Sequence, residues 1–248
     1  MKPYDLTGKR ILVTGASSGI GRACAICAAE LGASVVITGR RADALRVTLS
    51  MCAGSGHLIV AGDISSPDFV RVLAESAGKL DGLVHAAGIG PMCPVGMLTE
   101  DHVEMVMRTN YYSFLELVKY YSKNKYRNAH FSIVAVSSVS SSSGWGGGVV
   151  YCGSKGALSS SVRALAMELA PRGIRVNAVC PSNIRTPMYE AGASAMNDED
   201  SLKELIKKQP LGLGEPEQVG WPVCFLLSEA SSFITGVNLP VDGGYLAQ

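Results

Sequence analysis

The 248-residue sequence contains no apolar run long enough to cross a membrane, and residues 1–10 lack the apolar stretch of a secretory signal. It also lacks an excess of charge, because 22 basic and 21 acidic residues leave a formal net charge of +1. A nucleic-acid-binding surface requires a concentration of basic residues, so we expect neither nucleic acid nor a membrane as a partner. These absences favour a cytoplasmic protein that acts on a small molecule.

The 7 cysteines are odd in number and scattered, which argues against a disulfide framework. A chain without an export signal keeps such thiols reduced, which again indicates the cytosol. Cys24 and Cys27 form a C-x-x-C pair, but they lie in an alanine-rich helical pattern with no second ligand pair nearby. We therefore interpret them as packing residues and predict no metal site.

Short β-branched runs alternate with longer helical patterns, without a linker or an internal repeat. The pattern predicts strands at 10–14, 34–38, 57–61, 82–85, 131–137, 175–179 and 237–240, and helices near 20–31, 42–50, 67–77, 100–124, 152–170 and 216–228. Strands separated by helices form a parallel sheet, because a parallel connection needs a crossover. We predict an α/β fold with one doubly wound parallel seven-stranded sheet, a Rossmann fold, as a single domain over 1–248. Ligands bind such sheets at the carboxyl ends of the strands.

A glycine-rich stretch from Thr14 to Gly21, T-G-A-S-S-G-I-G, directly follows the first predicted strand and opens the next helix. Glycine lets the backbone turn sharply and approach a pyrophosphate, whose charge the N–H groups and dipole of the helix start stabilise. At this place the pattern predicts a dinucleotide site rather than a turn without a ligand. The residues expected to contact the cofactor are Gly15, Ser17, Ser18, Gly19, Ile20 and Gly21.

The second predicted strand is followed by Arg40 and Arg41, without the acidic residue that binds the ribose 2′-hydroxyl of NAD. Because guanidinium groups pair with phosphate through two hydrogen bonds, we predict that these arginines bind the 2′-phosphate of NADP. The alternative is that both only decorate an exposed helix start. Asp63, after the third strand, is expected either to accept a hydrogen bond from the adenine amine or to cap the following helix.

The pattern Tyr-x-x-x-Lys occurs twice, at Tyr121/Lys125 and at Tyr151/Lys155. On a helix it places both side chains on one face, where an ammonium favours the phenolate and prepares the tyrosine for proton transfer. The first pair closes a helix at the amino pole of the sheet, where we expect a solvated helix end. The second pair opens a helix at the carboxyl pole, so only Tyr151 and Lys155 can reach a nicotinamide.

Ser137 and Ser138 end a strand at the same pole, where a hydroxyl can donate to a substrate oxygen. Together, Thr14–Gly21, Asn110, Ser138, Tyr151–Lys155 and the segment Val241-Asp242-Gly243-Gly244 make the chain resemble the short-chain dehydrogenase/reductase family, including its 3-oxoacyl-carrier-protein reductases. The resemblance spans residues 7 to 245, with the motifs in the order and spacing of the family.

The resemblance implies specific roles. Tyr151 would be the general acid/base, and Lys155 would lower its pKa and bind the nicotinamide ribose. Ser138, rather than Ser137, would donate to the substrate oxygen, and Asn110 would hold a water that links Lys155 to solvent. Further contacts to the cofactor are implied for Ala87, Gly88, Pro181, Ile184 and Thr186.

The chain departs from the family pattern at two places. It has His85-Ala86-Ala87-Gly88 where the family often has Asn-Asn-Ala-Gly, and we interpret His85 as a structural residue rather than a catalyst. It also has Pro181-Ser182 where Pro-Gly is usual, which changes the backbone expected near the nicotinamide amide.

These features predict an NADP-dependent oxidoreductase that interconverts a ketone and a secondary alcohol. Residues 187–214 are the expected substrate lid, with an acidic patch at 198–200 that we interpret as a helix start, and the loop with Met92, Cys93 and Met97 is expected to add an apolar wall. The resemblance also implies a homotetramer. The alternatives are a sugar or polyol dehydrogenase that uses NAD, a nucleotide-sugar epimerase or dehydratase, and an NADP-sensing module without turnover.

Overall fold

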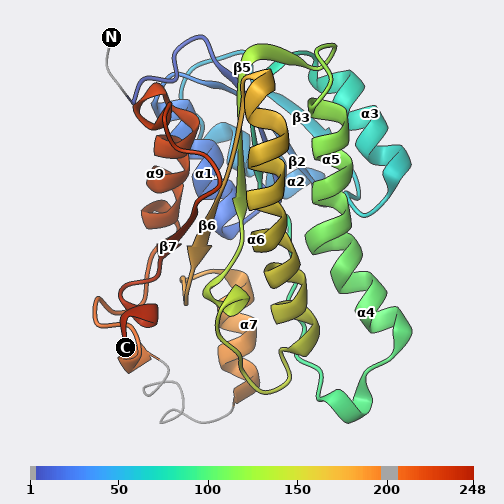
Figure 1. The fold of residues 1–248 in the computed structure, drawn as a ribbon, viewed down its shortest axis with the longest axis vertical. Helices are drawn as coiled ribbons and strands as arrows, with labels where there is room; N and C mark the ends of the chain where they lie inside the picture. The colour runs from blue at the N-terminus through green and yellow to red at the C-terminus, as the bar shows by residue number, and fades with distance from the viewer. Residues whose placement is uncertain (1–3, 197–205) are drawn as a thin grey trace.

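The computed structural model describes residues 4–196 and 206–248, in which seven parallel strands form one sheet of order β3-β2-β1-β4-β5-β6-β7 (Figure 1). The strands are β1 (Arg10–Thr14), β2 (Ser34–Gly39), β3 (Leu58–Ala61), β4 (Leu80–His85), β5 (Arg127–Val136), β6 (Ile174–Pro181) and β7 (Asn238–Val241). The strand order reverses between β1 and β4, which places the ligand crevice of a doubly wound sheet at the ends of these two strands.

Helices cover both faces of the sheet, so its strands are buried on both sides. Along β1, for example, Leu12 faces one apolar cluster while Ile11 and Val13 face the other. One face is covered by α1 (Gly19–Glu30), α2 (Ala42–Ser50) and α9 (Pro216–Leu227). The opposite face is covered by α3 (Pro67–Ala77), α5 (Ser113–Tyr121) and α6 (Val149–Leu169). Two further helices are α4 (Glu100–Met107) and α7 (Pro187–Met196).

The predicted doubly wound α/β fold is confirmed, and the differences are local. The predicted helix 100–124 is divided into α4, a π-helical turn at Arg108–Tyr112 and α5. Strand β5 begins at Arg127, four residues before the prediction, because its pairing with β4 shifts register between Leu80 and Gly82. Residues 197–205, which include the acidic patch expected to start a helix, lie outside the described residues.

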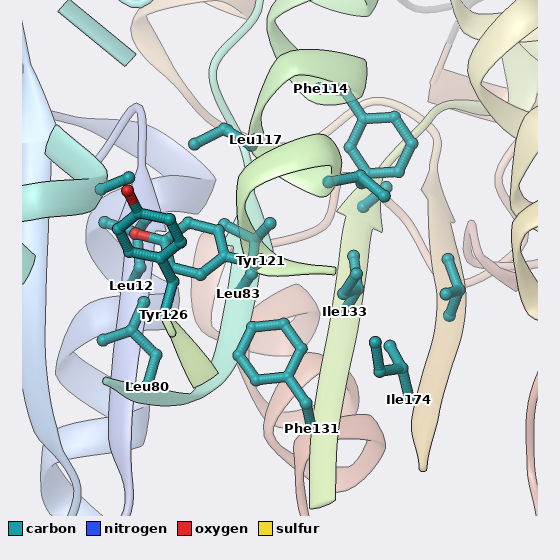
Figure 2. Close-up of a cluster of buried hydrophobic side chains, with 14 of the residues drawn as sticks. Leu12, Leu80, Leu83, Phe114, Leu117, Tyr121, Tyr126, Phe131, Ile133 and Ile174 are labelled. Atoms are coloured by element: carbon teal, nitrogen blue, oxygen red, sulfur yellow. The ribbon is translucent and has the colours of Figure 1, made fainter. Parts of the chain in front are cut away.

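The expectation of a solvated helix end at Tyr121/Lys125 is wrong. Helix α5 ends at Tyr121, so Lys125 lies beyond it in the turn that leads to β5. Tyr121 is fully buried and stacks on Phe131 with ring centroids 5.8 Å apart, and Figure 2 shows both side chains in the core. Lys125 instead lies over the ring of Tyr126, with its Nζ 5.0 Å from the centroid. Tyr121 is buried because it lies on the same face of α5 as Phe114, Leu117 and Val118, the face that packs on the sheet.

Cys24 and Cys27 are packing residues of the interface between α1 and α9. The helices approach closely at Gly220, where a Cβ would lie 2.8 Å from the Cys27 sulfur. Burial raises the pKa of Cys27 to about 12 and that of Cys24 further, so both thiols are held protonated and unreactive. Within the described part of the chain, no helix is both long and apolar enough to span a bilayer.

Candidate active site

The glycine loop packs closely on itself and on the chain just after β4, and two of its glycines have no room for a side chain. Gly15 has φ +67°, and a Cβ there would lie 2.8 Å from the Ala86 oxygen and the Ala87 nitrogen. At Gly21 a Cβ would lie 2.4 Å from the Gly15 oxygen. The side chain of Ser18 does not cap α1, and the first turn of α1 contains no acidic residue. The loop therefore offers free N–H groups and a positive helix end, which fits a pyrophosphate.

Two arginines follow β2 beside this loop. Arg40 and Arg41 are exposed, and neither guanidinium group forms an ion pair or hydrogen bond with any part of the chain that the structure describes. Gly39 lies next to Ser17, because a Cβ at position 39 would be 3.5 Å from the Ser17 hydroxyl oxygen. The nearest acid on α2, Asp43, pairs with Arg46 instead. Both guanidinium groups are thus available to an anion bound at the loop.

Asp63 shapes the turn before α3 and does not cap that helix. Its Oδ1 accepts hydrogen bonds from the Ser65 backbone N–H, at 2.9 Å, and from the Ser65 hydroxyl, at 2.8 Å. The cap of α3 is Ser66, whose hydroxyl accepts from the Phe69 N–H. The capping alternative for Asp63 is therefore wrong, while its Oδ2 has no hydrogen bond to the described residues that would oppose a role toward adenine.

The end of β6 closes the crevice from the other side. Gly19 has φ +53°, and a Cβ there would lie 3.1 Å from the Thr186 methyl carbon, so the glycine loop and Thr186 are in contact. Ile184, just before the 187–214 segment, forms a bridge with Gly214 at the end of that segment. The residue that replaces the usual glycine, Ser182, donates to the Asp242 backbone oxygen at 2.9 Å and so ties β6 to the chain after β7.

Tyr151 and Lys155 lie in the first two turns of α6, with the Lys155 Nζ 5.8 Å from the Tyr151 ring centroid. The ammonium is buried and donates to the Val136 backbone oxygen at 2.8 Å. Burial lowers the pKa of Lys155 to about 8. Burial raises the pKa of Tyr151, and a hydrogen bond with the Ser138 side chain opposes this effect. Burial of the phenol is thus the largest influence on the Tyr151 pKa in this structure, and a lowering by Lys155 stays a prediction.

The structure separates the two serines that end β5. Ser137 points into α6, where its hydroxyl donates to the Lys155 backbone oxygen at 3.2 Å and pairs with the Ser159 hydroxyl at 2.6 Å. Ser138 has extended backbone, and its hydroxyl accepts from the Ser140 N–H and interacts with the Tyr151 phenol. Of these two serines, Ser138 is the one that lies beside the Tyr151 phenol.

Asn110 is fully buried in the π-helical turn, where its side chain joins two elements. Its Oδ1 accepts from the Ile89 N–H at 2.8 Å, and its Nδ2 donates to the Ile89 oxygen at 2.9 Å and to the Ser154 hydroxyl at 3.0 Å. Gly88 leaves open the gap between Asn110 and Lys155, because a Cβ there would lie 3.5 Å from both Oδ1 and Nζ. This gap suits the water that the resemblance implies.

Sequence reasoning missed one wall of the site. The Trp145 ring lies 6.3 Å from the Tyr151 ring, between centroids, and packs on Gly148, where a Cβ would come within 2.4 Å of it. The expected apolar loop joins this wall, since the Cys93 N–H donates to the Gly147 oxygen at 2.9 Å. Met92 borders Gly147, while Met97 is 71% exposed. A tryptophan among glycines shortly before Tyr151 was the available signal.

The chain is similar to known proteins over nearly its whole length. A family model described as enoyl-(acyl carrier protein) reductase matches residues 15–246. A glucose 1-dehydrogenase of Gluconobacter oxydans (strain 621H) is 39% identical over 98% of this chain and 94% of its own length. A 3-oxoacyl-acyl-carrier-protein reductase of Rickettsia conorii is 35% identical over 98% of each chain. The chain belongs to the short-chain dehydrogenase/reductase family.

A solved structure of the same family supports the fold. It is a candidate NAD(P)-dependent gluconate 5-dehydrogenase of Beutenbergia cavernae with NADP bound at low occupancy, and it superposes with a TM-score of 0.90 at 31% identity, over 99% of this chain and 100% of the other. This short-chain dehydrogenase/reductase is therefore an oxidoreductase of alcohol or carbonyl groups that uses a nicotinamide dinucleotide.

Proposed function

We propose that this chain is an NADP-dependent oxidoreductase that interconverts a ketone and a secondary alcohol. The observation that carries the proposal is the convergence of Ser138, Tyr151 and Lys155 at the carboxyl pole of the sheet, beside the glycine loop. A hydroxyl donor, a phenol and a buried ammonium within one crevice are the groups that proton transfer to a carbonyl oxygen requires.

In the direction of reduction, the Tyr151 phenol donates its proton to the substrate oxygen while the Ser138 hydroxyl donates a hydrogen bond to the same oxygen. The chemistry that a bound nicotinamide supplies is hydride transfer to the substrate carbon. The phenolate left on Tyr151 is stabilised by the Lys155 ammonium and is reprotonated from solvent, through Lys155 and a water in the gap beside Gly88 and Asn110. Oxidation of the alcohol follows the reverse path.

The preference for NADP rests on Arg40 and Arg41. Both are exposed and unpaired within the described residues, and the only acid in the first turn of α2 is engaged by Arg46. A 2′-phosphate would supply the anion that these guanidinium groups lack, whereas the 2′-hydroxyl of NAD would leave them unused. The remaining cofactor contacts that we propose are those of the glycine loop, Asp63, Ala87, Gly88, Tyr151, Lys155, Pro181, Ile184 and Thr186.

The site favours a small polyhydroxylated substrate. Trp145 presents a broad apolar ring beside Tyr151, and such rings pack against the C–H faces of sugars, while the neighbouring serines offer hydroxyl groups. The names of two similar proteins, a glucose 1-dehydrogenase and a candidate gluconate 5-dehydrogenase, point to the same class. We take residues 187–214 as the lid over this substrate.

We also propose that the protein acts in the cytoplasm as a homotetramer. Large apolar side chains are exposed on α6, on α9 and before β7, where Met167 is 79% and Trp221 44% exposed and Phe233 is fully exposed. Association of copies would cover these side chains. Light scattering coupled to size exclusion measures the mass directly, and a mass of four chains is expected.

The function is tested by titrating the protein with NADPH and NADH, followed by oxidation assays against ketoses, keto sugar acids, β-ketoacyl esters and simple ketones. Tighter binding of NADPH and turnover with polyhydroxylated ketones are expected. Preference for NADH would overturn the cofactor assignment. Binding of NADPH without turnover on any ketone would instead favour the NADP-sensing module.

A further inference from the structure

His85 occupies a fully buried position at the carboxyl end of β4, between the glycine loop and the π-helical turn. Its Nδ1 lies 3.2 Å from the Thr14 hydroxyl and its Nε2 lies 3.4 Å from the Asn110 backbone oxygen. The Phe114 ring packs beside the imidazole, with centroids 5.5 Å apart. Both ring nitrogens therefore have a polar partner, and no water is needed to satisfy them.

The hydrogen bonds of Thr14 determine which nitrogen carries the proton. The Thr14 hydroxyl oxygen accepts from the N–H groups of Ala86 and Ala87, each at 3.1 Å, which uses both of its lone pairs. Its own hydrogen can then go only to the His85 Nδ1, which must act as an acceptor. The proton of the neutral imidazole is thus on Nε2, which donates to the Asn110 backbone oxygen.

The surroundings of the imidazole keep it neutral. Burial, and secondarily the Lys155 charge, lower the pKa of His85 to about 3. The other groups that face the ring are the Thr14 hydroxyl, the Asn110 carbonyl and the Phe114 ring, and none of them is an acid that would favour the charged form. A second cation beside the buried ammonium would be unfavourable.

The chain of hydrogen bonds continues from Asn110 to the catalytic helix. The Asn110 Nδ2 donates to the Ser154 hydroxyl, which in turn donates to the Tyr151 backbone oxygen at 2.7 Å. From Thr14 to Tyr151, every donor points in the same direction along the chain. Such a chain fixes the distance between the nucleotide loop and the general acid more rigidly than isolated contacts would.

We propose that His85 is a positioning residue whose single, fixed tautomer couples the glycine loop to Asn110 and, through Ser154, to Tyr151. This inference rests on the roles proposed above for Asn110 and Tyr151. The side chain offers one acceptor and one donor to two polar groups, and it does so without adding charge next to Lys155.

The tautomer is tested by NMR on the whole protein labelled with ¹⁵N-histidine, with the His85 signal assigned from a His85→Asn variant. The expected spectrum shows Nε2 protonated and Nδ1 unprotonated from pH 5 to 9, and the signal of exposed His130 serves as the surface comparison. Thr14→Val removes the hydroxyl that donates to Nδ1, so we expect a mixture of both tautomers. Thr14→Ser keeps that hydroxyl and should show the single wild-type tautomer. An Nδ1-protonated or charged His85 in the wild type would overturn the proposal.

Kinetics test the coupling. His85→Leu removes both hydrogen bonds and is expected to lower kcat about 10- to 100-fold, with KM for the ketone and Kd for NADPH changed by less than about threefold. His85→Asn, which keeps a donor and an acceptor, is expected to recover most of kcat. A role confined to stability would lower Tm and leave kcat of the folded variant unchanged, which would contradict the coupling. If His85→Leu does not fold, the proposal is decided by the NMR spectra of the wild type and of the two Thr14 variants. The spectrum does not depend on turnover, so its outcome is separate from failure of the proposed function.

Discussion

Replacement of Gly15 by alanine tests how closely the glycine loop lies against β4. The new Cβ would lie 2.8 Å from the Ala86 oxygen and from the Ala87 nitrogen and Cα, all of them backbone atoms. The left-handed φ of +67° costs alanine about 1–2 kcal/mol, and the steric overlap adds about 1–3 kcal/mol. The free energy of unfolding should therefore fall by about 2–5 kcal/mol, which lowers Tm by about 4–20 °C in a chain of this size.

Gly8→Ala is the matched control. Gly8 has φ +78°, but no heavy atom lies within 4 Å of its Cβ position. Alanine at position 8 therefore carries only the conformational cost of a positive φ, about 1–2 kcal/mol. Thermal unfolding of the two variants, together with NADPH titration, separates conformation from contact. Gly15→Ala should lower Tm more than Gly8→Ala does. Gly15→Ala should also bind NADPH more weakly than the wild type, while Gly8→Ala binds NADPH with the wild-type affinity. Equal Tm shifts with equal NADPH affinities would refute the close approach of the loop.

Three further predictions follow from the site. The double variant Arg40→Ala/Arg41→Ala should weaken NADPH binding about 30-fold or more and leave NADH within about threefold, as measured by fluorescence titration; equal losses for both would exclude a 2′-phosphate contact. Lys155→Met should have a larger free energy of unfolding than the wild type below pH 8, and this difference should vanish as the pH rises to about 10.5. The reason is that Lys155 has a pKa near 8 in the folded chain, whereas the unfolded chain still binds the proton between pH 8 and about 10.5. Urea unfolding at pH 7 and pH 10.5 measures the difference, and a constant excess would contradict buried charge as its cause. Trp145→Ala should raise KM for polyhydroxylated ketones about tenfold but leave simple ketones nearly unchanged; a uniform rise would argue against stacking.

The sheet could be predicted because its strands are buried on both faces and therefore appear as short apolar runs between helices. The position of Tyr151 after such a strand was enough to prefer it over Tyr121. The burial of Tyr121 could have been predicted, because Phe114, Leu117 and Tyr121 recur at helical spacing on one apolar face of α5. The pattern did not show that α5 ends at Tyr121 and leaves Lys125 outside the helix.

The residue types alone did not show the orientation of the side chains, although the family resemblance had already favoured Ser138 over Ser137. Ser137 and Ser138 are identical in type, and only their backbone directions show that one faces α6 and the other Tyr151. The role of His85 depends on partners from β1 and the π-helical turn, which are far apart along the chain. Trp145 became recognisable as a wall only once its ring lay beside Tyr151.

The most direct test of the account is the turnover of Tyr151→Phe with NADPH and a ketone that the wild type reduces. The substitution removes only the phenolic hydroxyl, so the fold and NADPH affinity should be retained while kcat falls by about 10²–10⁴-fold, the usual contribution of a general acid. A variant that binds NADPH and still turns over at the wild-type rate would contradict Tyr151 as the proton donor.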